Sequence, residues 1–155
     1  MSCPTDLSSL GVPMMLPVTS GMPIDLPSCP VPDARIVVID DEPVNVKVVA
    51  RLLRIEGYTQ FFTTTEARDA VRLVREETPD IVLLDLMMPH VGGLEILNEL
   101  RADVATAHIP VIILTASTDH ETRTAALRGG ANDFLNKPID PSELAPRVGN
   151  LLVSK

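Results

Sequence analysis

Short apolar segments alternate with longer amphipathic stretches along most of the chain. The apolar segments are continuous rather than alternating, and β-branched residues are frequent in them, as in RIVVI and VIIL. Such runs are typical of β-strands that are covered on both faces. The pattern predicts strands at Arg35–Asp40, Thr59–Thr63, Ile81–Leu84, Val111–Leu114 and Phe134–Asn136.

The stretches between these strands have the spacing of amphipathic helices. In the first of them, Val46, Val49 and Leu53 fall on one helical face. The predicted helices are Val44–Glu56, Glu66–Glu77, Leu94–Ala102, a segment from Asp119 to Arg128, and Ser142–Val153. The start and stop signals are Thr65 and Asp119 as N-caps, and Gly57, Gly129 and Gly130 as helix ends.

Strand and helix alternate strictly through five strand–helix pairs. This order predicts a parallel sheet with helices on both faces. Right-handed crossovers then produce a doubly wound α/β sandwich of three layers. In sheets of this kind the functional site lies beyond the carboxyl ends of the strands, near the point where the strand order switches.

The first 33 residues differ from the rest in composition. They hold seven of the 14 prolines and no lysine or arginine. Prolines at this density exclude a long helix or a central strand. We therefore predict a Pro-rich leader at 1–33, either flexible or a packing arm, and a folded domain at 34–155. An arm would pack through Met14, Met15, Leu16 and Val18.

Charge and composition exclude several classes of function. The net charge of −8 argues against contact with nucleic acid or with an anionic membrane surface. Hydrophobic residues make up 45% of the chain and aromatic residues only 3%, so the core must be aliphatic. The two cysteines, Cys3 and Cys29, lie outside the predicted domain, which fits reduced thiols in the cytoplasm. No apolar run is long enough for a transmembrane helix.

Polar residues follow four of the predicted strands. Asp40 and Asp41 come at the end of the first strand, Asp85 after the third, Thr115 after the fourth and Lys137 after the fifth. The carboxyl ends of parallel strands meet at one edge of a sheet, so these side chains should converge. The sequence predicts a single site that holds three carboxylates, a hydroxyl and an ammonium group.

A cluster of carboxylates would repel one another without a cation. Mg²⁺ prefers carboxylate, carbonyl and water oxygens, and it also bridges to phosphoryl oxygens. A carboxylate can attack phosphorus as a nucleophile, while a lysine supplies a mobile positive charge and a threonine a hydrogen bond. Each residue taken alone has a structural explanation: Asp40 or Asp41 as N-cap of the helix at Pro43, Asp85 as a turn residue, Thr115 as a loop residue, and Lys137 as a solvated lysine. Their joint placement favours the site.

At these positions the sequence resembles a known family. The strings VVIDDEP, VLLDLMMPHVGG, VIILTA and DFLNKP are similar to the motifs of response-regulator receiver domains in two-component signalling. The resemblance extends from Ala34 to Val153. It implies a flavodoxin-like (βα)5 fold, with a parallel five-stranded sheet in the order 2-1-3-4-5.

The resemblance also implies a role for each residue of the site. Asp85 would accept the phosphoryl group. Asp40, Asp41, Asp85 and the backbone carbonyl of Met87 would hold Mg²⁺. Lys137 would contact Asp85 and then the phosphoryl group, and the Lys137–Pro138 peptide bond would be cis.

Two further roles are implied around the acceptor. Thr115 would hydrogen-bond the phosphoryl group and move toward it, and Phe134 would rotate inward behind it. Phenylalanine has no hydroxyl, so a switch at this position would act through shape alone. Met87 and Ser117 would flank the path of the water that removes the phosphoryl group. Neither is a plausible general base, so self-dephosphorylation should be slow.

The implied partners are a sensor histidine kinase or a histidine phosphotransfer protein. The face of the fourth helix, fifth strand and fifth helix would contact a second copy or an effector domain. Such a chain is a cytoplasmic signalling module and not an enzyme. A degenerate receiver used only for docking is the alternative.

Three enzyme or redox classes fit poorly. A haloacid-dehalogenase-type phosphatase needs an aspartate where Met87 stands, and the P-loop sequence of nucleotide hydrolases is absent. A flavodoxin would need a hydroxyl- and glycine-rich phosphate loop in place of Asp40 and Asp41.

Overall fold

One parallel sheet forms the centre of the molecule. The computed structural model describes residues 31–116 and 120–153. The strands are β1 (Arg35–Ile39), β2 (Gln60–Thr64), β3 (Ile81–Asp85), β4 (Val111–Thr115) and β5 (Asp133–Asn136). They lie in the order β2-β1-β3-β4-β5, and every neighbouring pair is parallel. The predicted flavodoxin-like topology is therefore confirmed, with strand bounds shifted by about one residue.

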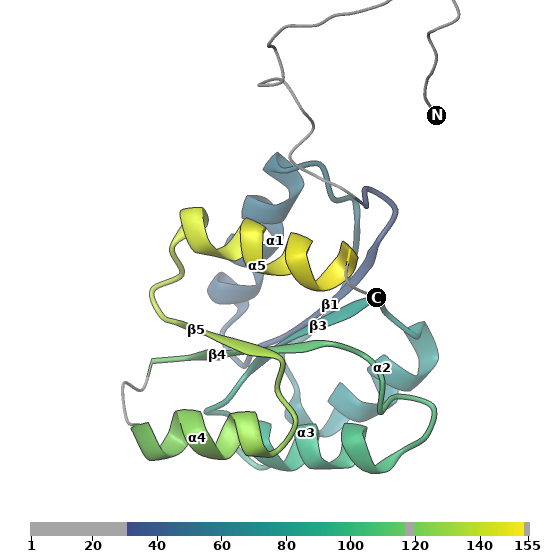
Figure 1. Ribbon diagram of the computed structural model, residues 1–155, viewed down its shortest axis with the longest axis vertical. Coiled ribbons are helices and arrows are strands. Elements are labelled where there is room, and N and C mark those ends of the chain that lie inside the picture. Colours follow the sequence, from purple (N-terminus) through teal and green to yellow (C-terminus); the bar gives the residue numbers. More distant parts are fainter. Residues whose placement is uncertain (1–30, 117–119, 154–155) are drawn as a thin grey trace, which may run out of the picture.

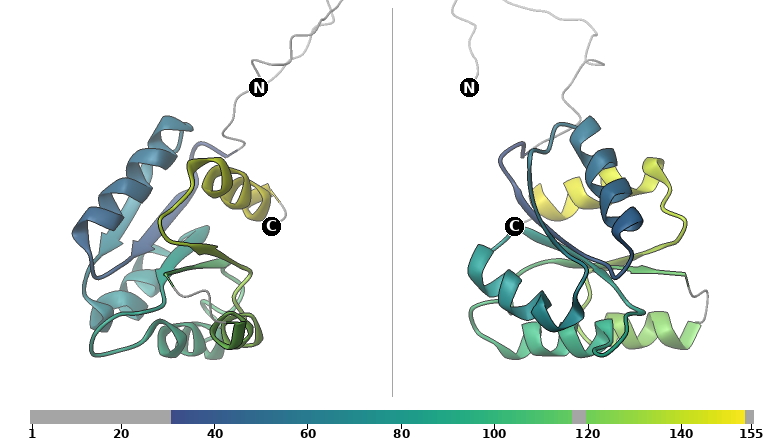
Figure 2. Two further views of the ribbon diagram at one scale, coloured as in Figure 1. Left: turned by 90° about the vertical axis from the view of Figure 1, so that its left-hand side faces the viewer. Right: turned by 180° about the vertical axis from the view of Figure 1, so that it is seen from behind.

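Helices cover both faces of this sheet. They are α1 (Pro43–Ile55), α2 (Ala70–Glu77), α3 (Gly93–Ala102), α4 (His120–Arg128) and α5 (Pro141–Val153). Helices α1 and α5 lie on one face, and α2, α3 and α4 lie on the other (Figures 1 and 2). From β1 the chain crosses to β2 on one side and then returns to β3, β4 and β5 on the other, as expected for a doubly wound sheet. Within the described residues, no helix is long and apolar enough to cross a membrane.

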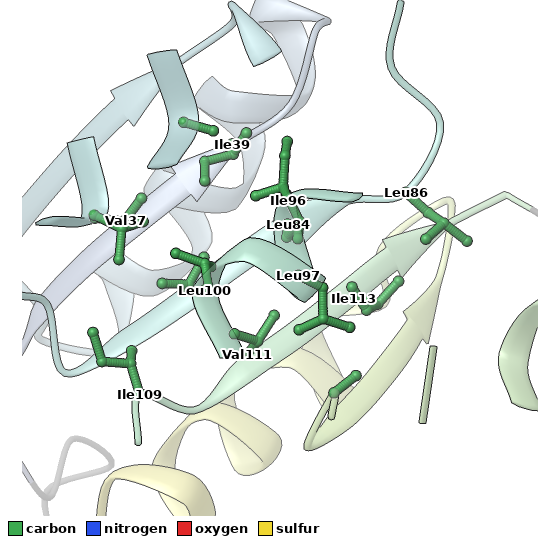
Figure 3. Packing of buried hydrophobic residues seen from close by; sticks show 14 of the residues in the cluster. Val37, Ile39, Leu84, Leu86, Ile96, Leu97, Leu100, Ile109, Val111 and Ile113 are labelled. Carbon is green, nitrogen blue, oxygen red and sulfur yellow. The ribbon is translucent and has the colours of Figure 1, made fainter. Parts of the chain in front are cut away.

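Each face of the sheet has its own core, which is largely aliphatic and on one face also includes the buried Tyr58. Along a strand, side chains point alternately to the two faces. Ile36 and Val38 of β1 therefore pack under α1 and α5, whereas Val37 and Ile39 pack under α2 and α3. Figure 3 shows the second cluster, in which residues of β1, β3 and β4 meet those of α3. Both faces are buried, which explains why the strands read as continuous apolar runs.

The predicted helix signals are met in part. Gly57 follows α1 with a φ of 113°, and Gly130 follows α4 with a φ of 106°, so both adopt the left-handed conformation that favours glycine. Helix α2 also ends in this conformation, at Thr78 with a φ of 42°. That end was not predicted because threonine is not a usual residue there. The predicted cap Asp119 lies outside the described residues.

Thr65 is not the N-cap that we predicted. The Thr64 hydroxyl accepts a hydrogen bond from the Glu66 amide at 3.0 Å and turns the chain at the end of β2. A 3-10 turn, η3 (Ala67–Asp69), follows, and the Glu66 side chain caps it by accepting from the Arg68 amide. Helix α2 begins only at Ala70, because residues 66–69 form this turn first.

Candidate functional site

The predicted polar residues meet at one edge of the sheet. Asp40 follows β1, Asp85 and Thr115 are the last residues of β3 and β4, and Lys137 follows β5. The strand register aligns these ends, with Asp85 beside Leu114 and Thr115 beside Asn136. The Lys137 amide also donates to the Thr115 carbonyl at 2.8 Å, which extends the pairing beyond β5. Four strands thus fix the positions of the site residues.

Three carboxylates form the centre of this site. Asp40, Asp41 and Asp85 each place one carboxylate oxygen so that these atoms lie within 4.8 Å of one another. Asp40 is 0% exposed and Asp85 2% exposed, whereas Asp41 is half-buried and opens the cluster toward solvent. Oxygen ligands at this spacing, partly open to water, suit a hard divalent cation such as Mg²⁺. The acidic cluster can therefore hold a metal ion.

Asp40 is held in place by its neighbours. Its Oδ1 accepts hydrogen bonds from the Glu42 amide at 3.0 Å and from the Asn45 side chain at 3.5 Å. The structural explanation of Asp40 or Asp41 as N-cap of α1 is wrong, because Glu42 occupies that position and makes no side-chain cap. Asp40 bonds the chain before the helix starts, which orients its carboxylate toward the site.

Lys137 supplies the positive charge. Its Nζ lies 2.8 Å from Asp40 Oδ2 and 3.1 Å from Asp85 Oδ1. The peptide bond between Lys137 and Pro138 is cis, as the resemblance implied. One ammonium group faces three carboxylates here, so the cluster keeps an excess of negative charge when all three are ionised.

The pKa of Asp85 reflects both its burial and this excess of negative charge. Burial raises the pKa of Asp85 to about 6, and the nearby Asp40 charge and the hydrogen bond with Asp41 act in the same direction. Lys137 opposes them. Burial on its own would lower the pKa of Lys137, but its hydrogen bonds with Asp40 and Asp85 outweigh burial and raise it. A second cation would relieve the repulsion that remains.

The loop after β3 depends on a glycine. The Gly93 amide donates to the Leu86 carbonyl at 2.9 Å. A Cβ added to Gly93 would lie 2.5 Å from the Asp85 carbonyl oxygen and 2.6 Å from the Leu86 Cα. No other residue fits there, because both contacts are with backbone.

Met87 lies on the rim of this loop. Its amide donates to Asp85 Oδ1 at 3.3 Å, and its side chain is 67% exposed. Its side chain is therefore mostly accessible to solvent beside Asp85. Ser117, the other residue predicted to flank the water path, lies outside the described residues.

Thr115 and Phe134 share one face of the sheet. Phe134 pairs with Ile113, and Thr115 follows Ile113 by two positions, so all three side chains point toward α4. Thr115 is 1% exposed, and Phe134 is half-buried against the core that contains Ile113. The guanidinium carbon of Arg123, on α4, lies 4.1 Å from the centroid of the Phe134 ring. Sequence reasoning missed this contact, because nothing in the local pattern joins a helix arginine to a strand phenylalanine.

Comparison with known proteins decides the family. Residues 36–149 match the response regulator receiver domain. The chain belongs to this family. The receiver domain is a module of signalling proteins and is not itself an enzyme family, so the phosphatase and flavodoxin alternatives are set aside.

Individual relatives agree with this assignment. The response regulator PleD of Caulobacter vibrioides is 40% identical over 118 residues, which are 76% of this chain and 26% of PleD. Protein PilH of Pseudomonas aeruginosa is 34% identical over 77% of this chain and 98% of its own. The receiver thus spans about a quarter of one relative and nearly all of another.

A solved structure has the same fold. A putative response regulator from Chloroflexus aurantiacus superimposes with a TM-score of 0.74 at 28% identity, and the match covers 78% of this chain and 98% of the other. The two chains therefore share the same fold over most of their length. This shared fold supports the assignment from the sequence comparisons.

Proposed function

We propose that this receiver accepts a phosphoryl group on Asp85 from a sensor histidine kinase or a histidine phosphotransfer protein in the cytoplasm. It would then switch a partner or an effector domain. The observation that carries the proposal is the meeting of three carboxylates with Lys137 at a buried sheet edge. Asp85 is the best acceptor because it ends the central strand β3 and touches both Lys137 and the acidic cluster.

The chemistry is a phosphoryl transfer to oxygen. An Asp85 carboxylate oxygen attacks phosphorus, and the bond from phosphorus to the donor atom breaks. The donor leaves with that electron pair, a histidine nitrogen or the oxygen of acetate. The product is an aspartyl phosphate on Asp85. A Mg²⁺ held by Asp40, Asp41, Asp85 and the Met87 backbone carbonyl would neutralise charge on the phosphoryl oxygens.

The remaining residues bind and report the phosphoryl group. Lys137 loses its negatively charged partner when the Asp85 carboxylate becomes esterified. Its ammonium group can then bind a phosphoryl oxygen. The Thr115 hydroxyl can donate to another oxygen, and Phe134 lies on the same face to follow it. We propose that the signal leaves through the face of α4, β5 and α5, toward a second copy or an effector domain.

The first expected result is covalent labelling. Acetyl phosphate with Mg²⁺ should add one phosphoryl group to the intact protein, measured by mass spectrometry. Labelling should be lost in EDTA and in Asp41→Ala, because the acidic cluster can then no longer hold the cation. Removal of one of three clustered like charges should leave the fold intact. Normal labelling of Asp41→Ala in Mg²⁺ would show that the ligands are different.

The same sample separates the active receiver from the degenerate docking module. A docking module would remain unlabelled at any concentration of donor. In the labelled protein, backbone amide shifts should change on α4, β5 and α5. Shifts confined to α1 would contradict the proposed output face.

A further expected result concerns how long the phosphoryl group remains. Met87 is apolar and flexible and Ser117 is short, so neither orients a water molecule for attack on phosphorus. We expect phosphate release to take minutes or longer. The double variant Met87→Asn with Ser117→Glu should release phosphate about tenfold faster, because polar groups can position the water. Unchanged or slower release from this variant would refute the argument.

A further inference from the structure

Helix α4 buries few apolar side chains against the sheet. Among its described residues only Ala126 is buried as part of the hydrophobic core. Contacts near both of its ends also hold the helix. At its C-terminal end, Arg101 of α3 donates to the Gly130 carbonyl at 3.0 and 2.8 Å. Near its N-terminal end, the Arg123 guanidinium stacks on Phe134 of β5 at 4.1 Å.

The Arg123 stack is made at a cost. The Nε of Arg123 is buried and has no hydrogen-bond partner among the described residues. A buried donor without an acceptor destabilises, while the attraction between a guanidinium and a ring face stabilises by a comparable amount. By contrast, Arg35 stacks on Phe62 at 4.7 Å but also binds Glu77 at 2.7 Å. The Arg123–Phe134 distance is therefore shorter than the Arg35–Phe62 distance. The Arg123 Nε, unpaired within the described part of the chain, also cancels much of the stabilisation that this stack contributes.

We propose that Arg123 is a positioning residue that holds Phe134 in its half-buried orientation and so restrains the switch. This inference rests on the proposed function of the receiver, because it concerns the regulation of the same site. An inward rotation of Phe134 breaks the stack and frees the Arg123 Nε to meet water. The lost stacking energy and the gained hydration of Nε offset each other. The inward and the half-buried orientations of Phe134 are therefore close in free energy, as a two-state element requires.

The Arg123 stack also changes the role that we expect for Phe134. Phenylalanine lacks a hydroxyl, and from the sequence we expected its switch to act through shape alone. The stack gives the ring face an electrostatic partner on α4. Movement of the ring is thereby coupled to the N-terminal half of α4, while the Arg101–Gly130 contacts fix the other end as a pivot.

The test compares two arginines of the same helix. Arg123→Ala removes the stack, and Arg128→Ala removes the same charge from an exposed position nearby. In the unphosphorylated protein, amides of the N-terminal half of α4 should exchange hydrogen about threefold faster in Arg123→Ala, with no change in Arg128→Ala. Labelling by acetyl phosphate should be faster by a similar factor, because Phe134 is no longer restrained. Arg123→Lys keeps the charge and should lie between wild type and Arg123→Ala.

A double-substitution cycle decides whether Phe134 is involved. In a Phe134→Leu background, Arg123→Ala should have no further effect on exchange or labelling, because the ring face is already absent. A full effect in that background, or an equal effect of Arg128→Ala, would overturn the proposal. The exchange measurements need no phosphodonor. Failure of wild-type labelling would therefore reject the proposed function, and the exchange data would still decide the role of Arg123.

Discussion

Replacement of Asp85 by asparagine is expected to reduce phosphoryl incorporation by at least about a hundredfold, because the nucleophile itself is removed. The amide oxygen of asparagine is neutral and cannot form a stable phosphoryl ester. The measurement is intact mass after incubation with acetyl phosphate and Mg²⁺. Asp69→Asn is the matched control, since Asp69 lies on η3, its side chain is 46% exposed, and it forms a salt bridge with Arg72. Full labelling of Asp85→Asn would place the acceptor elsewhere.

The same substitution should make the metal-free protein more stable. Burial raises the pKa of Asp85 to about 6 from its ordinary value of 3.8. The folded state therefore binds this proton more tightly than the unfolded state, and ionised Asp85 destabilises the fold above pH 6. That cost fades as the pH falls from 6 toward 3.8. At pH 8 in EDTA, Asp85→Asn should raise the free energy of unfolding by about 1–3 kcal/mol. A destabilised variant would mean that its loss of labelling reflects unfolding.

The architecture was predictable because its causes are local in sequence. The run Val111–Leu114 is apolar throughout because both faces of β4 are covered. Asp85 and Thr115 were predicted to meet because parallel strands end at one edge, whatever the packing of the helices. The position of Lys137 followed from the same rule. These residues lie at strand ends, where the strand register fixes the position of the backbone.

Features that depend on contacts across the fold could not be predicted in this way. Gly93 is required by the backbone of Asp85 and Leu86, which a sequence pattern does not place beside it. The left-handed conformation of His90, with a φ of 73°, follows from the shape of the same loop. The stack of Arg123 on Phe134 joins α4 to β5 and depends on how the helix settles on the sheet. Local propensity carries no information about such pairs.

The last expected result concerns the single ammonium group of the site. Lys137 Nζ lies 2.8 Å from Asp40 and 3.1 Å from Asp85, and both carboxylates are buried. Lys137→Met leaves these charges without their cation. Removal of one partner of a buried ion pair typically costs about 3–5 kcal/mol. Because Asp85 can take up a proton in response, we expect a loss near the lower limit, about 3 kcal/mol, at pH 8 in EDTA.

The origin of this loss can be tested by restoring the charge balance in three ways. Lys137 lowers the pKa of Asp85, so its removal should raise that pKa further. Protonation of Asp85 at pH 5 should then recover part of the stability, as should Mg²⁺ at pH 8 or the added substitution Asp85→Asn. Urea unfolding measures each case, and Lys47→Met serves as control because Lys47 is exposed on α1. An equal loss of stability in Lys137→Met with and without Asp85→Asn would show that the side chain stabilises through packing, because the charge of Asp85 would then make no difference.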